Sequence, residues 1–269
     1  MSDSIAVIVS TYNAPEMLRL ALNGYKQQTD QRFKIYIADD GSTSETKDVI
    51  DAFRVTSPIP VKHVWHADKG FRKSRIHNKV IAQLQDEYVL FTDGDCIPVP
   101  GLIAVHRRIA KQGCFVSGSR ILLSQELSKQ LKTRNAVDTN ISLFRYLTWR
   151  SRGYVNRLLP LLLPPHASAP HQRLDGIRGC HLACWRTNLQ AVNGFDESFE
   201  GWGREDSDLA ARLLHAGIQR VDLRGVPVLH LWHKEESRHR LQGNDDMLRE
   251  CLTSKRIRAR TGLAELSSQ

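Results

Sequence analysis

The sequence predicts an α/β fold in which helices flank a mostly parallel sheet. Through the first 120 residues, short apolar runs rich in β-branched residues alternate with amphipathic stretches at helical spacing. The apolar runs are continuous, which is typical of strands buried on both faces of a parallel sheet. Two of them end in carboxylates, at the edge where such sheets bind ligands. A chain of 269 residues, 41% of them hydrophobic, can form a single domain with an elaborated end.

The first strand, expected at 5–10, leads into a helix that starts near Pro15, because proline suits the first turn of a helix. The same unit then repeats along the chain. Further strands are expected at 33–42, 61–66 and 88–95, with helices at 44–54 and 71–85, and then a helix and a short strand between 101 and 120.

The composition changes between residues 121 and 174, which are richer in Arg, aromatic residues and Leu and end in a proline-containing loop. This change sets the segment apart from the alternating strands and helices before it. Beyond it we expect a turn-rich segment at 193–206, a helix at 207–217, a pair of strands near 218–223 and 226–233, and a charged C-terminal helix.

Charge and cysteine usage bear on partners and compartment. Lys and Arg outnumber Asp and Glu by 38 to 29, with a pI near 9.5, which favours anionic partners such as nucleotides, nucleic acid or acidic lipid. The N-terminus lacks a basic segment followed by a long apolar one, and the apolar stretch at 158–164 is short and broken by prolines. The five cysteines form no even framework. We therefore expect a cytoplasmic protein with reduced thiols and no spanning helix.

The segment Asp93-Gly94-Asp95 ends an expected strand. Two carboxylates separated by one residue offer hard oxygen ligands to a divalent cation, and Gly94 permits close approach of the backbone. An isolated Asp-x-Asp is more often an ordinary turn, because turns favour Asp and Gly for their own reasons. A second acidic strand end in the same chain shifts the interpretation towards a site that holds Mg²⁺ or Mn²⁺ against a diphosphate.

Asp39 and Asp40 form that second acidic strand end, where a carboxylate can accept the imide N–H of a uracil or hydrogen-bond a ribose. A turn is again the alternative. Arg72, Lys73 and Arg75 lie at the start of an expected helix, where guanidinium groups and helix N–H groups suit phosphate oxygens. Basic residues on helices are also often simply solvated.

A glycine-rich turn at 201–204 leads to the adjacent acids Glu205 and Asp206 and then to a helix. Transfer to a sugar hydroxyl with inversion needs a carboxylate that removes the hydroxyl proton, and its neighbour can bind a hydroxyl. The alternative is a helix start whose acids complement the macrodipole. Trp202, between glycines and beside these acids, is suited to stacking on a sugar.

His230 ends an expected strand, and His233 lies three residues further on. A neutral imidazole can complete a metal shell begun by Asp95, and with such ligands Mn²⁺ is preferred to Mg²⁺. A lone histidine at a strand end is more often structural. Beside an acidic metal motif, His230 is the favoured ligand and His233 the less favoured one.

Five motifs, in order, make the chain recognisable. VIVSTYN, IADDGS and FTDGDCIP resemble the family-two glycosyltransferases, whose GT-A fold is Rossmann-like. NGFDESFEGWGREDSDLAARLLHAG and the following VLHLWH resemble the C-terminal motif of β-1,4-galactosyltransferases and of bacterial chondroitin-polymerase-type enzymes. The resemblance covers about residues 4–120 and 175–235. It implies three parts: a nucleotide-sugar-binding half at 1–120, a variable acceptor-side or membrane-proximal segment at 121–174, and an acceptor and catalytic half at 175–269.

The resemblance also implies an inverting enzyme that uses Mn²⁺ or Mg²⁺ and moves a sugar from a nucleotide diphosphate, UDP above others, to a saccharide or lipid-linked saccharide. Synthesis of a bacterial surface polysaccharide or lipopolysaccharide is the expected context. Asp206 is then the base, Glu205 an acceptor contact and Trp202 the gating tryptophan. The metal ligands are Asp93, Asp95 and His230, with Asp95 the direct ligand. The expected nucleotide and donor contacts are Thr11, Tyr12, Asn13, Asp39, Asp40, Arg72, Arg75, Asp93, Gly94 and Asp95.

Two other functions are compatible with part of the pattern. A nucleotidyltransferase also needs strand-end carboxylates and a metal, but it usually has a glycine-rich, basic phosphate loop where this chain has STYNAPE. A nucleic-acid-binding protein would explain the net charge of +9. No recognised nucleic-acid-binding motif accompanies that charge, so we expect no nucleic-acid partner.

The segment 143–163 alternates apolar and aromatic residues with arginines. Phe144, Leu147, Tyr154 and Leu158 alternate with Arg145, Arg150, Arg152 and Arg157. Such a surface can rest on an anionic membrane interface, which would make the protein peripheral on the inner face of the membrane. The alternative is a helix that packs on the sheet with its arginines extended to solvent.

Overall fold

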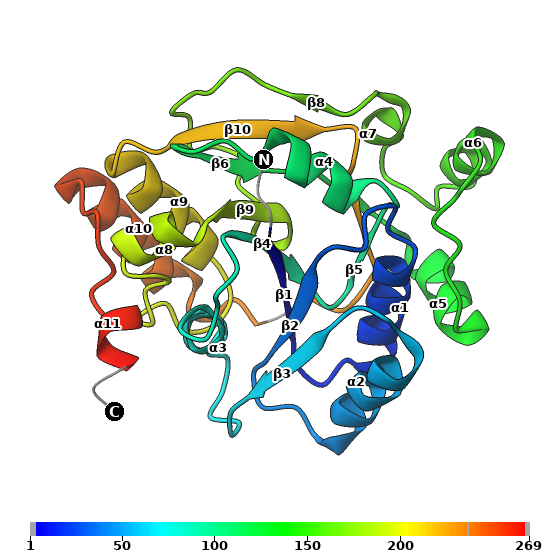
Figure 1. The fold of residues 1–269 in the computed structure, drawn as a ribbon, viewed down its shortest axis with the longest axis horizontal. Coiled ribbons are helices and arrows are strands. Elements are labelled where there is room, and N and C mark those ends of the chain that lie inside the picture. The colour runs from blue at the N-terminus through cyan, green and yellow to red at the C-terminus, as the bar shows by residue number, and fades with distance from the viewer. Residues whose placement is uncertain (1–3, 236, 267–269) are drawn as a thin grey trace.

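The computed structural model describes residues 4–235 and 237–266, and its elements form a mixed α/β fold with a large central sheet, as the sequence predicts. Within the described residues the main sheet has the strand order β3 (Val61–Trp65), β2 (Lys34–Asp39), β1 (Ile5–Thr11), β4 (Tyr88–Asp93), β9 (Leu182–Trp185), β6 (Cys114–Ser117), β10 (Gln219–Arg224) and β8 (His166–Ala167). Figure 1 shows this sheet crossing the molecule from β3 at the bottom to β8 at the top.

The sheet is mostly parallel. β3, β2, β1 and β4 run in one direction, and β6 and β10 run parallel to each other. β9 is antiparallel to both β4 and β6, and β8 is antiparallel to β10. The carboxyl ends of β1, β2 and β4 therefore lie at one edge, and their register pairs Thr11 with Asp39 and Ser10 with Asp93.

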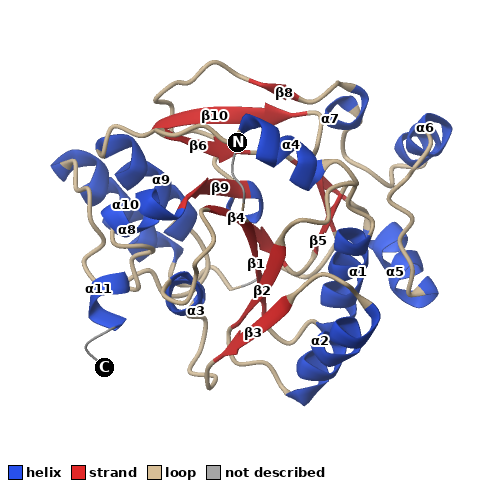
Figure 2. Ribbon diagram, in the orientation of Figure 1, coloured by secondary structure: helices blue, strands red, loops and turns tan. Residues whose placement is uncertain are grey.

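Helices cover both faces of the sheet (Figure 2). The helices are α1 (Pro15–Lys26), α2 (Ser44–Thr56), α3 (Lys73–Ile81), α4 (Leu102–Ile109), α5 (Gln125–Arg134), α6 (Leu143–Ser151), α7 (Leu159–Leu162), α8 (Arg186–Ala191), α9 (Glu205–His215), α10 (Leu241–Ser254) and α11 (Leu263–Leu266), with a 3₁₀ turn at Gly179–His181.

Two hydrophobic clusters hold these layers together, one on each face of the sheet. Ile5, Val7 and Val9 of β1 join the cluster formed with α1, α2, α4, α5 and α6. Ala6 and Ile8 of the same strand join the cluster formed with α3, α8 and α9. The alternation of side chains along a strand explains this division, and it explains why the apolar run of β1 is continuous.

A second, three-stranded sheet lies beside the main one and has the order β5 (Cys96–Pro98), β11 (Val228–His230) and β7 (Arg120–Leu122). The sequence prediction of a strand pair near 218–223 and 226–233 is wrong in one respect. Both strands form, but β10 joins the main sheet and β11 joins this small one. The register of β11 with β5 places His230 opposite Cys96, directly after the Asp93-Gly94-Asp95 turn.

The sequence does not predict the antiparallel strand β9. A contact at the buried His181 sets how closely this strand packs beside β6. The backbone N–H of Gly118 donates to the carbonyl of His181, just before β9, at 2.8 Å. A Cβ atom at position 118 would lie only 2.2 Å from the His181 ring, so only glycine fits there.

The part of the chain that is described contains no helix long and apolar enough to cross a bilayer.

Candidate active site

A cavity of about 360 Å³ opens where β4, α3, α9 and the segment before β9 meet. Its walls are largely polar and carry both signs of charge. The lining residues are Lys73, Asp93, Arg120, Ile177, Arg178, Gly179, Cys180, Trp202, Gly203, Arg204, Glu205, Asp206, Ser207, Arg238 and Leu241. Three of the expected site acids, Asp93, Glu205 and Asp206, are therefore brought together from distant parts of the sequence.

The turn after β4 packs tightly on β1. The N–H of Gly94 donates to the carbonyl of Ser10 at 2.7 Å, and a Cβ atom at this position would lie 3.1 Å from the same oxygen. Asp93 Oδ1 accepts hydrogen bonds from Ser10 Oγ and Lys73 Nζ, both at 2.7 Å. Burial alone would raise the pKa of Asp93, but the Lys73 ammonium outweighs burial and lowers it. Asp93 is thus a carboxylate at neutral pH.

Lys73 connects the two acid clusters. Its Nζ lies 2.7 Å from Asp93 Oδ1 and 3.8 Å from Glu205 Oε1, and its side chain is mostly buried. Burial opposes the charged form, but the Asp93 carboxylate overcomes this effect and raises the pKa of Lys73. Arg72 and Arg75, also expected to meet phosphate, do not line the cavity: the Arg72 guanidinium donates to the carbonyl of Ala67, and Arg75 pairs with Glu197.

Asp95 meets both candidate histidines. Its Oδ2 lies 3.6 Å from His230 Nε2 and 3.1 Å from His233 Nε2, so the less favoured histidine is the nearer one. The ligand atoms of Asp95, Cys96 and His230 all lie within 4.8 Å of one another. Burial lowers the pKa of His230 despite Asp95, which keeps its imidazole neutral and its nitrogen free to bind a metal. This set of donors fits a divalent cation.

Glu205 and Asp206 form the first turn of α9, so the helix begins before Ser207, where the sequence predicts its start. Asp206 Oδ2 accepts from the N–H of Gly179 at 2.7 Å, and Oδ1 accepts from the N–H of Ser207. Glu205 Oε2 is buried and accepts no hydrogen bond from the described residues. Burial, and then the neighbouring charge of Asp206, raise the pKa of Glu205 to about 7.

The loop before α9 presents Trp202, which is 40% exposed, at the mouth of the cavity. The guanidinium carbon of Arg238 lies 5.1 Å from the centre of the Trp202 ring, a cation–π contact. The loop is held from below by Asn244 of α10, whose amide donates to the carbonyls of Glu200 and Gly203. The indole therefore lies on an anchored loop and faces solvent, as a sugar-stacking residue requires.

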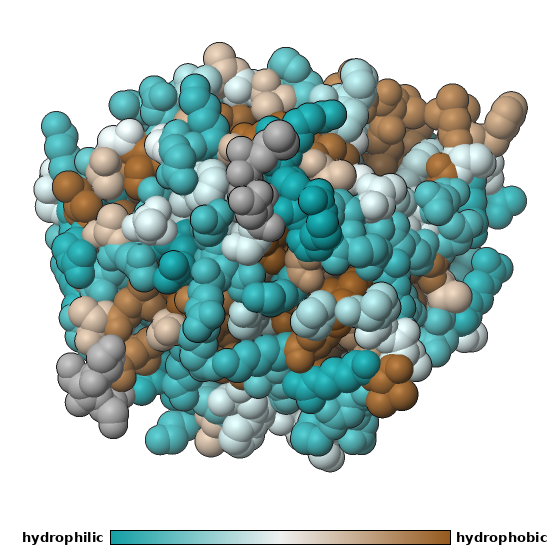
Figure 3. All heavy atoms as spheres, viewed as in Figure 1, coloured by the Kyte–Doolittle hydropathy of each residue, from teal (hydrophilic) through white to brown (hydrophobic). Residues whose placement is uncertain are grey.

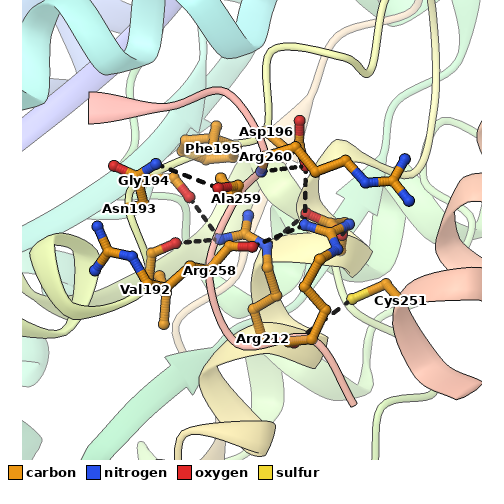
Figure 4. A network of polar contacts seen from close by, with 12 residues as sticks. Val192, Asn193, Gly194, Phe195, Asp196, Arg212, Cys251, Arg258, Ala259 and Arg260 are labelled. Carbon is orange, nitrogen blue, oxygen red and sulfur yellow. Dashed lines mark hydrogen bonds and ion pairs between the residues drawn. The ribbon is translucent and has the colours of Figure 1, made fainter. Parts of the chain in front are cut away.

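Helix α9 is fixed by the buried polar network in Figure 4. Arg212 Nε donates to Asp208 Oδ2 at 2.7 Å, and its Nη1 donates to the carbonyls of Val192 and Gly194. Arg256 donates to Asp208 at 3.0 Å and to Asp196 at 2.9 Å. The network ties the helix that carries Glu205 and Asp206 to the preceding turn and to the C-terminal segment.

The carboxylates after β2 are engaged inside the protein. Asp39 contacts His63 Nε2 at 2.8 Å and accepts from the N–H of Ser42. Asp40 contacts His66 Nε2 at 2.6 Å and accepts from the N–H of Arg72 at 2.7 Å. Both aspartates are buried, so a nucleotide would have to share these oxygens.

The segment after β1 borders these aspartates. The carbonyl of Thr11 accepts from the N–H of Asp40, and Asn13 exchanges hydrogen bonds with the Ser42 hydroxyl and the Thr43 N–H. The half-exposed Tyr12 donates its hydroxyl hydrogen to Asp68 at 2.8 Å, which leaves its ring open to a planar ligand. All three expected donor contacts thus lie at the same sheet edge as Asp39 and Asp93.

Sequence reasoning missed several residues of this region, and four of them carry donor groups of chemical interest: Cys96, Arg120, Arg178 and Cys180. Cys96 follows the acidic motif directly, and that position was a usable signal. The other three come from loops and short strands whose meeting depends on β9. All five cysteines of the chain are free and buried.

Two family models match the chain. The model described as glycosyl transferase family 2 matches residues 6–164, and the model described as the N-terminal domain of galactosyltransferase matches residues 166–234. The first match alone covers more than half of the chain. The two matches together contain every residue placed at the site above except Arg238, Leu241, Asn244 and Arg256.

Several characterised proteins are similar in sequence. Chondroitin synthase of Escherichia coli is 24% identical over 246 residues, which cover 85% of this chain and 34% of that protein. Validoxylamine A glucosyltransferase of Streptomyces hygroscopicus subsp. jinggangensis is 24% identical over 234 residues, covering 80% and 52%. Hyaluronan synthase of Pasteurella multocida is 23% identical over 246 residues, covering 84% and 24%. The chain thus spans about half or less of each relative.

Solved structures share the fold. The mannosyltransferase PcManGT from Pyrobaculum calidifontis, in complex with GDP-Man and Mn²⁺, has a TM-score of 0.60 at 17% identity and covers 96% of this chain and 65% of its own. TarS 1–349 of S. aureus in complex with UDP has a TM-score of 0.63 at 14% identity, covering 97% and 68%. At this identity the likeness concerns the fold alone.

Proposed function

Because the chain belongs to glycosyl transferase family 2, we propose that it is an inverting, metal-dependent enzyme that transfers a sugar from a nucleotide diphosphate donor, UDP above others, to a saccharide acceptor. The observation that carries this proposal is the meeting of Asp93, Lys73, Glu205 and Asp206 around one cavity at the carboxyl edge of the sheet. The family match favours sugar transfer over the nucleotidyl transfer and nucleic-acid binding considered from the sequence.

The donor belongs at the edge formed by β1, β2 and β4. Residues 11–13 and Asp39 are proposed to contact the nucleoside, with the half-exposed Tyr12 ring beside the base. Asp95 and His230 would hold the cation, with Asp93 and His233 beside them, and a bound Mn²⁺ or Mg²⁺ would neutralise the leaving diphosphate. Nucleotide-sugar and Mn²⁺ complexes of proteins with this fold, which include GDP-Man and UDP-GlcNAc, support this arrangement.

The acceptor belongs on the opposite wall. Asp206 is the proposed base, because its two oxygens are oriented by backbone N–H groups and it lines the cavity. Glu205 presents a buried oxygen that accepts no hydrogen bond from the described residues, which suits an acceptor hydroxyl. Trp202 is proposed to stack on the sugar. In-line attack of the deprotonated hydroxyl then displaces the nucleotide in a single step without a covalent intermediate.

The same proposal assigns a role to each part of the chain. Residues 1–120 bind the donor, residues 175–269 bind the acceptor and supply the base, and residues 121–174 border a membrane or the acceptor. Glycan synthesis at the inner face of a bacterial membrane is the proposed context, since the relatives include a chondroitin synthase and a hyaluronan synthase.

An exposed apolar surface on α6 and α7 supports the membrane contact. The exposed side chains are Leu143 (55%), Phe144 (83%), Leu147 (46%), Leu159 (63%), Leu162 (46%) and Leu163 (37%). Figure 3 shows a group of brown, hydrophobic spheres at the upper right, where Figure 1 has these helices. We call these six residues the α6–α7 surface. Exposed Arg150 and Arg152 lie between its two parts in the sequence, and we propose that it rests on an anionic bilayer.

The inner side of α6 fits the alternative considered from the sequence, a helix that packs against the rest of the fold. Tyr146 and Trp149 are buried in the hydrophobic core, and the guanidinium of Arg145 lies 5.7 Å from the Trp149 ring. Tyr154 and Leu158, which were expected to be part of the exposed surface, instead pack partly against the core. Helix α6 is therefore apolar on both sides, one side packed and the other open.

Donor hydrolysis tests the proposed function, because a transferase of this kind slowly passes its sugar to water. The purified chain would be incubated with UDP-, GDP- and dTDP-sugars in Mn²⁺, in Mg²⁺ and in EDTA. We expect metal-dependent release of one nucleotide and a rise in melting temperature with that nucleotide plus metal. Absence of both effects for every donor would contradict the proposal.

A further inference from the structure

The charges that line the cavity are unequal. Five cationic side chains, Lys73, Arg120, Arg178, Arg204 and Arg238, face three carboxylates, Asp93, Glu205 and Asp206. A donor that carries two phosphate charges brings its own divalent counter-ion, so donor binding does not by itself account for these cations. Two of them also pair with carboxylates outside the cavity, so the position of each cation, and not the total charge, indicates which ligand it can bind.

Two of the cations belong to the donor side. Lys73 is bound to Asp93 at 2.7 Å. Burial opposes the charge of the Arg120 guanidinium, but the neighbouring Cys180, and then Cys96 and Asp93, raise its pKa. Both side chains adjoin the end of β4, where the diphosphate is proposed to bind. Lys73 is paired with Asp93 on that wall, and Arg120 lies near the same carboxylate.

The other three adjoin the proposed base and the stacking tryptophan. Arg204 is paired with Asp245 outside the cavity. Arg238 lies over the Trp202 ring at 5.1 Å and pairs with Glu235 at 2.8 Å. Arg178 precedes Gly179, whose N–H holds Asp206 Oδ2 at 2.7 Å, and its side chain makes no ion pair or hydrogen bond within residues 4–235 and 237–266. Its exposed guanidinium is thus open to a ligand next to the base.

A guanidinium on a cavity wall beside a base is suited to an oxyanion, because its forked N–H groups bind a carboxylate or a phosphate in two places. Given the proposed function, we infer that the acceptor is an anionic sugar, whose carboxylate or phosphate binds Arg178 while its reacting hydroxyl faces Asp206 and its ring lies on Trp202. Arg238, which lies over the same indole, adds to the positive field at this wall. A neutral saccharide would offer no anionic group to the Arg178 guanidinium.

Glycan binding by the full chain in UDP and Mn²⁺ tests this inference. The immobilised probes would be matched oligosaccharides that end in a neutral hexose, in the corresponding hexuronate, or in the hexose phosphate. We expect retention on one of the two anionic arms, and the arm that retains the protein identifies carboxylate or phosphate as the recognised group. Selective retention on the neutral arm, or none on either anionic arm, would overturn the inference.

The matched variants are R178Q and R173Q. Both remove one positive charge from the same exposed segment, but Arg173 does not line the cavity. We expect R178Q to reduce anionic-glycan affinity about tenfold or more, which is the usual size of one lost charge-assisted contact, whereas R173Q changes it little. Equal losses in both variants would show that only net charge matters and would overturn the inference.

The affinity for UDP and Mn²⁺ is measured in the same variants. If R178Q weakens UDP binding as much as glycan binding, Arg178 serves the diphosphate and the anionic acceptor is wrong. If wild-type UDP binding is itself absent, it is the proposed function that fails. The two failures are therefore distinguishable.

Discussion

Among single side chains, Lys73 has the most consequence for the charge of the site. Its ammonium lies between a donor-side carboxylate, Asp93, and an acceptor-side carboxylate, Glu205. Without it, three acids would line one cavity with no cation between the two clusters, and their mutual repulsion would oppose ionisation. Lys73 thus allows Asp93 to remain ionised while Glu205, with a pKa near 7, is only partly so.

Replacement of Asp95 tests the metal site. In Asp95→Asn the amide is a much poorer cation ligand than the carboxylate, so we expect loss of transfer and of the Mn²⁺-dependent part of UDP affinity. Calorimetric titration of UDP with Mn²⁺ and with EDTA measures this. Asp51→Asn, an exposed carboxylate on α2, is the control. Unchanged UDP affinity in Mn²⁺ would refute the assignment of Asp95.

Replacement of Asp206 tests the base. In Asp206→Asn the side-chain oxygen can still accept from the Gly179 N–H, so the fold and donor affinity should be nearly unchanged. Turnover should fall by roughly 10²–10⁴-fold, the usual contribution of a general base. Steady-state transfer rates and a UDP titration on the same preparation give both quantities. A variant that loses donor affinity but keeps its maximal rate would contradict the role.

At the level of elements, α9 is positioned by a buried ion pair. Asp208 and Arg212 are both completely buried, and Arg256 joins them from the C-terminal segment. Asp208→Asn would leave two guanidinium groups without their shared carboxylate, and breaking such a pair typically costs about 3–5 kcal/mol of unfolding free energy. Urea unfolding measures the loss, with Asp51→Asn as the exposed control. Equal stability of the two variants would argue that the network does not fix the helix.

The α6–α7 surface gives a prediction about membrane contact. Arg157 donates to the carbonyl of Arg120, so only Arg150 and Arg152 are changed. Wild-type protein should float with anionic vesicles at low salt, and R150Q/R152Q should not, because anionic headgroups contribute about 1 kcal/mol per basic residue. Phe144→Ser, which removes the most exposed apolar group of the surface, should also reduce flotation.

The control for flotation is K62Q/R249Q, which removes the same charge from exposed positions on β3 and α10. It should float like wild type, and donor hydrolysis should persist in all of these variants. If the wild-type protein stays in the soluble fraction even at low salt, the membrane contact is wrong. The surface would then be assigned to a soluble partner or acceptor.

On the scale of the whole molecule, buried histidines make stability depend on pH. Tyr88 donates to His106 Nδ1, His106 Nε2 donates to His181 Nε2, and His181 Nδ1 donates to the carbonyl of Ser119. This assignment of donors leaves both rings neutral. Burial lowers the pKa of His181 to about 4 and that of His106 well below its usual value, and burial also lowers the pKa of His77 to about 3.

Since the pKa of histidine in the unfolded chain is about 6.5, the unfolded state binds protons that the native state does not as the pH falls below that value. The stability from these histidines is complete above about pH 6.5 and is lost on acidification. Glu205, whose pKa is raised, acts in the opposite direction. We expect the urea midpoint to fall between pH 7 and pH 5, and to fall more steeply in Glu205→Gln. A midpoint independent of pH in this range would refute the prediction.

The sequence predicts the first half of the fold well, because its strands and helices carry strong local patterns. β1, β2, β3 and β4 all lie where the apolar runs indicate. β9 escaped prediction because its four residues, Leu182–Trp185, include no β-branched side chain and its partners are distant in sequence. In the small sheet, β11 lies within the predicted strand at 226–233, whereas β5 and β7, each only three residues long, carry even less signal.

The site residues also divide into those marked by a local sequence pattern and those brought together by contacts distant in sequence. The acids and histidines were predicted because each stands at the end of a local pattern. The contact of Lys73 with both acid clusters, and the position of Arg178 beside Asp206, depend on how β9 and α9 approach β4. No local pattern in the sequence encodes those distances.

The position of β9 has a consequence for the chain during its synthesis. β1 to β4 leave the ribosome early and pair locally, but one edge of β4 stays open until residues 182–185 emerge, and β6 joins the sheet only through β9. An apolar strand with unpaired backbone groups readily pairs with another copy. A nascent chain that ends before residue 182 therefore exposes an aggregation-prone strand edge, and chaperones should bind it until β9 has emerged. Products truncated before β9 should accumulate as aggregates instead of as folded half-domains.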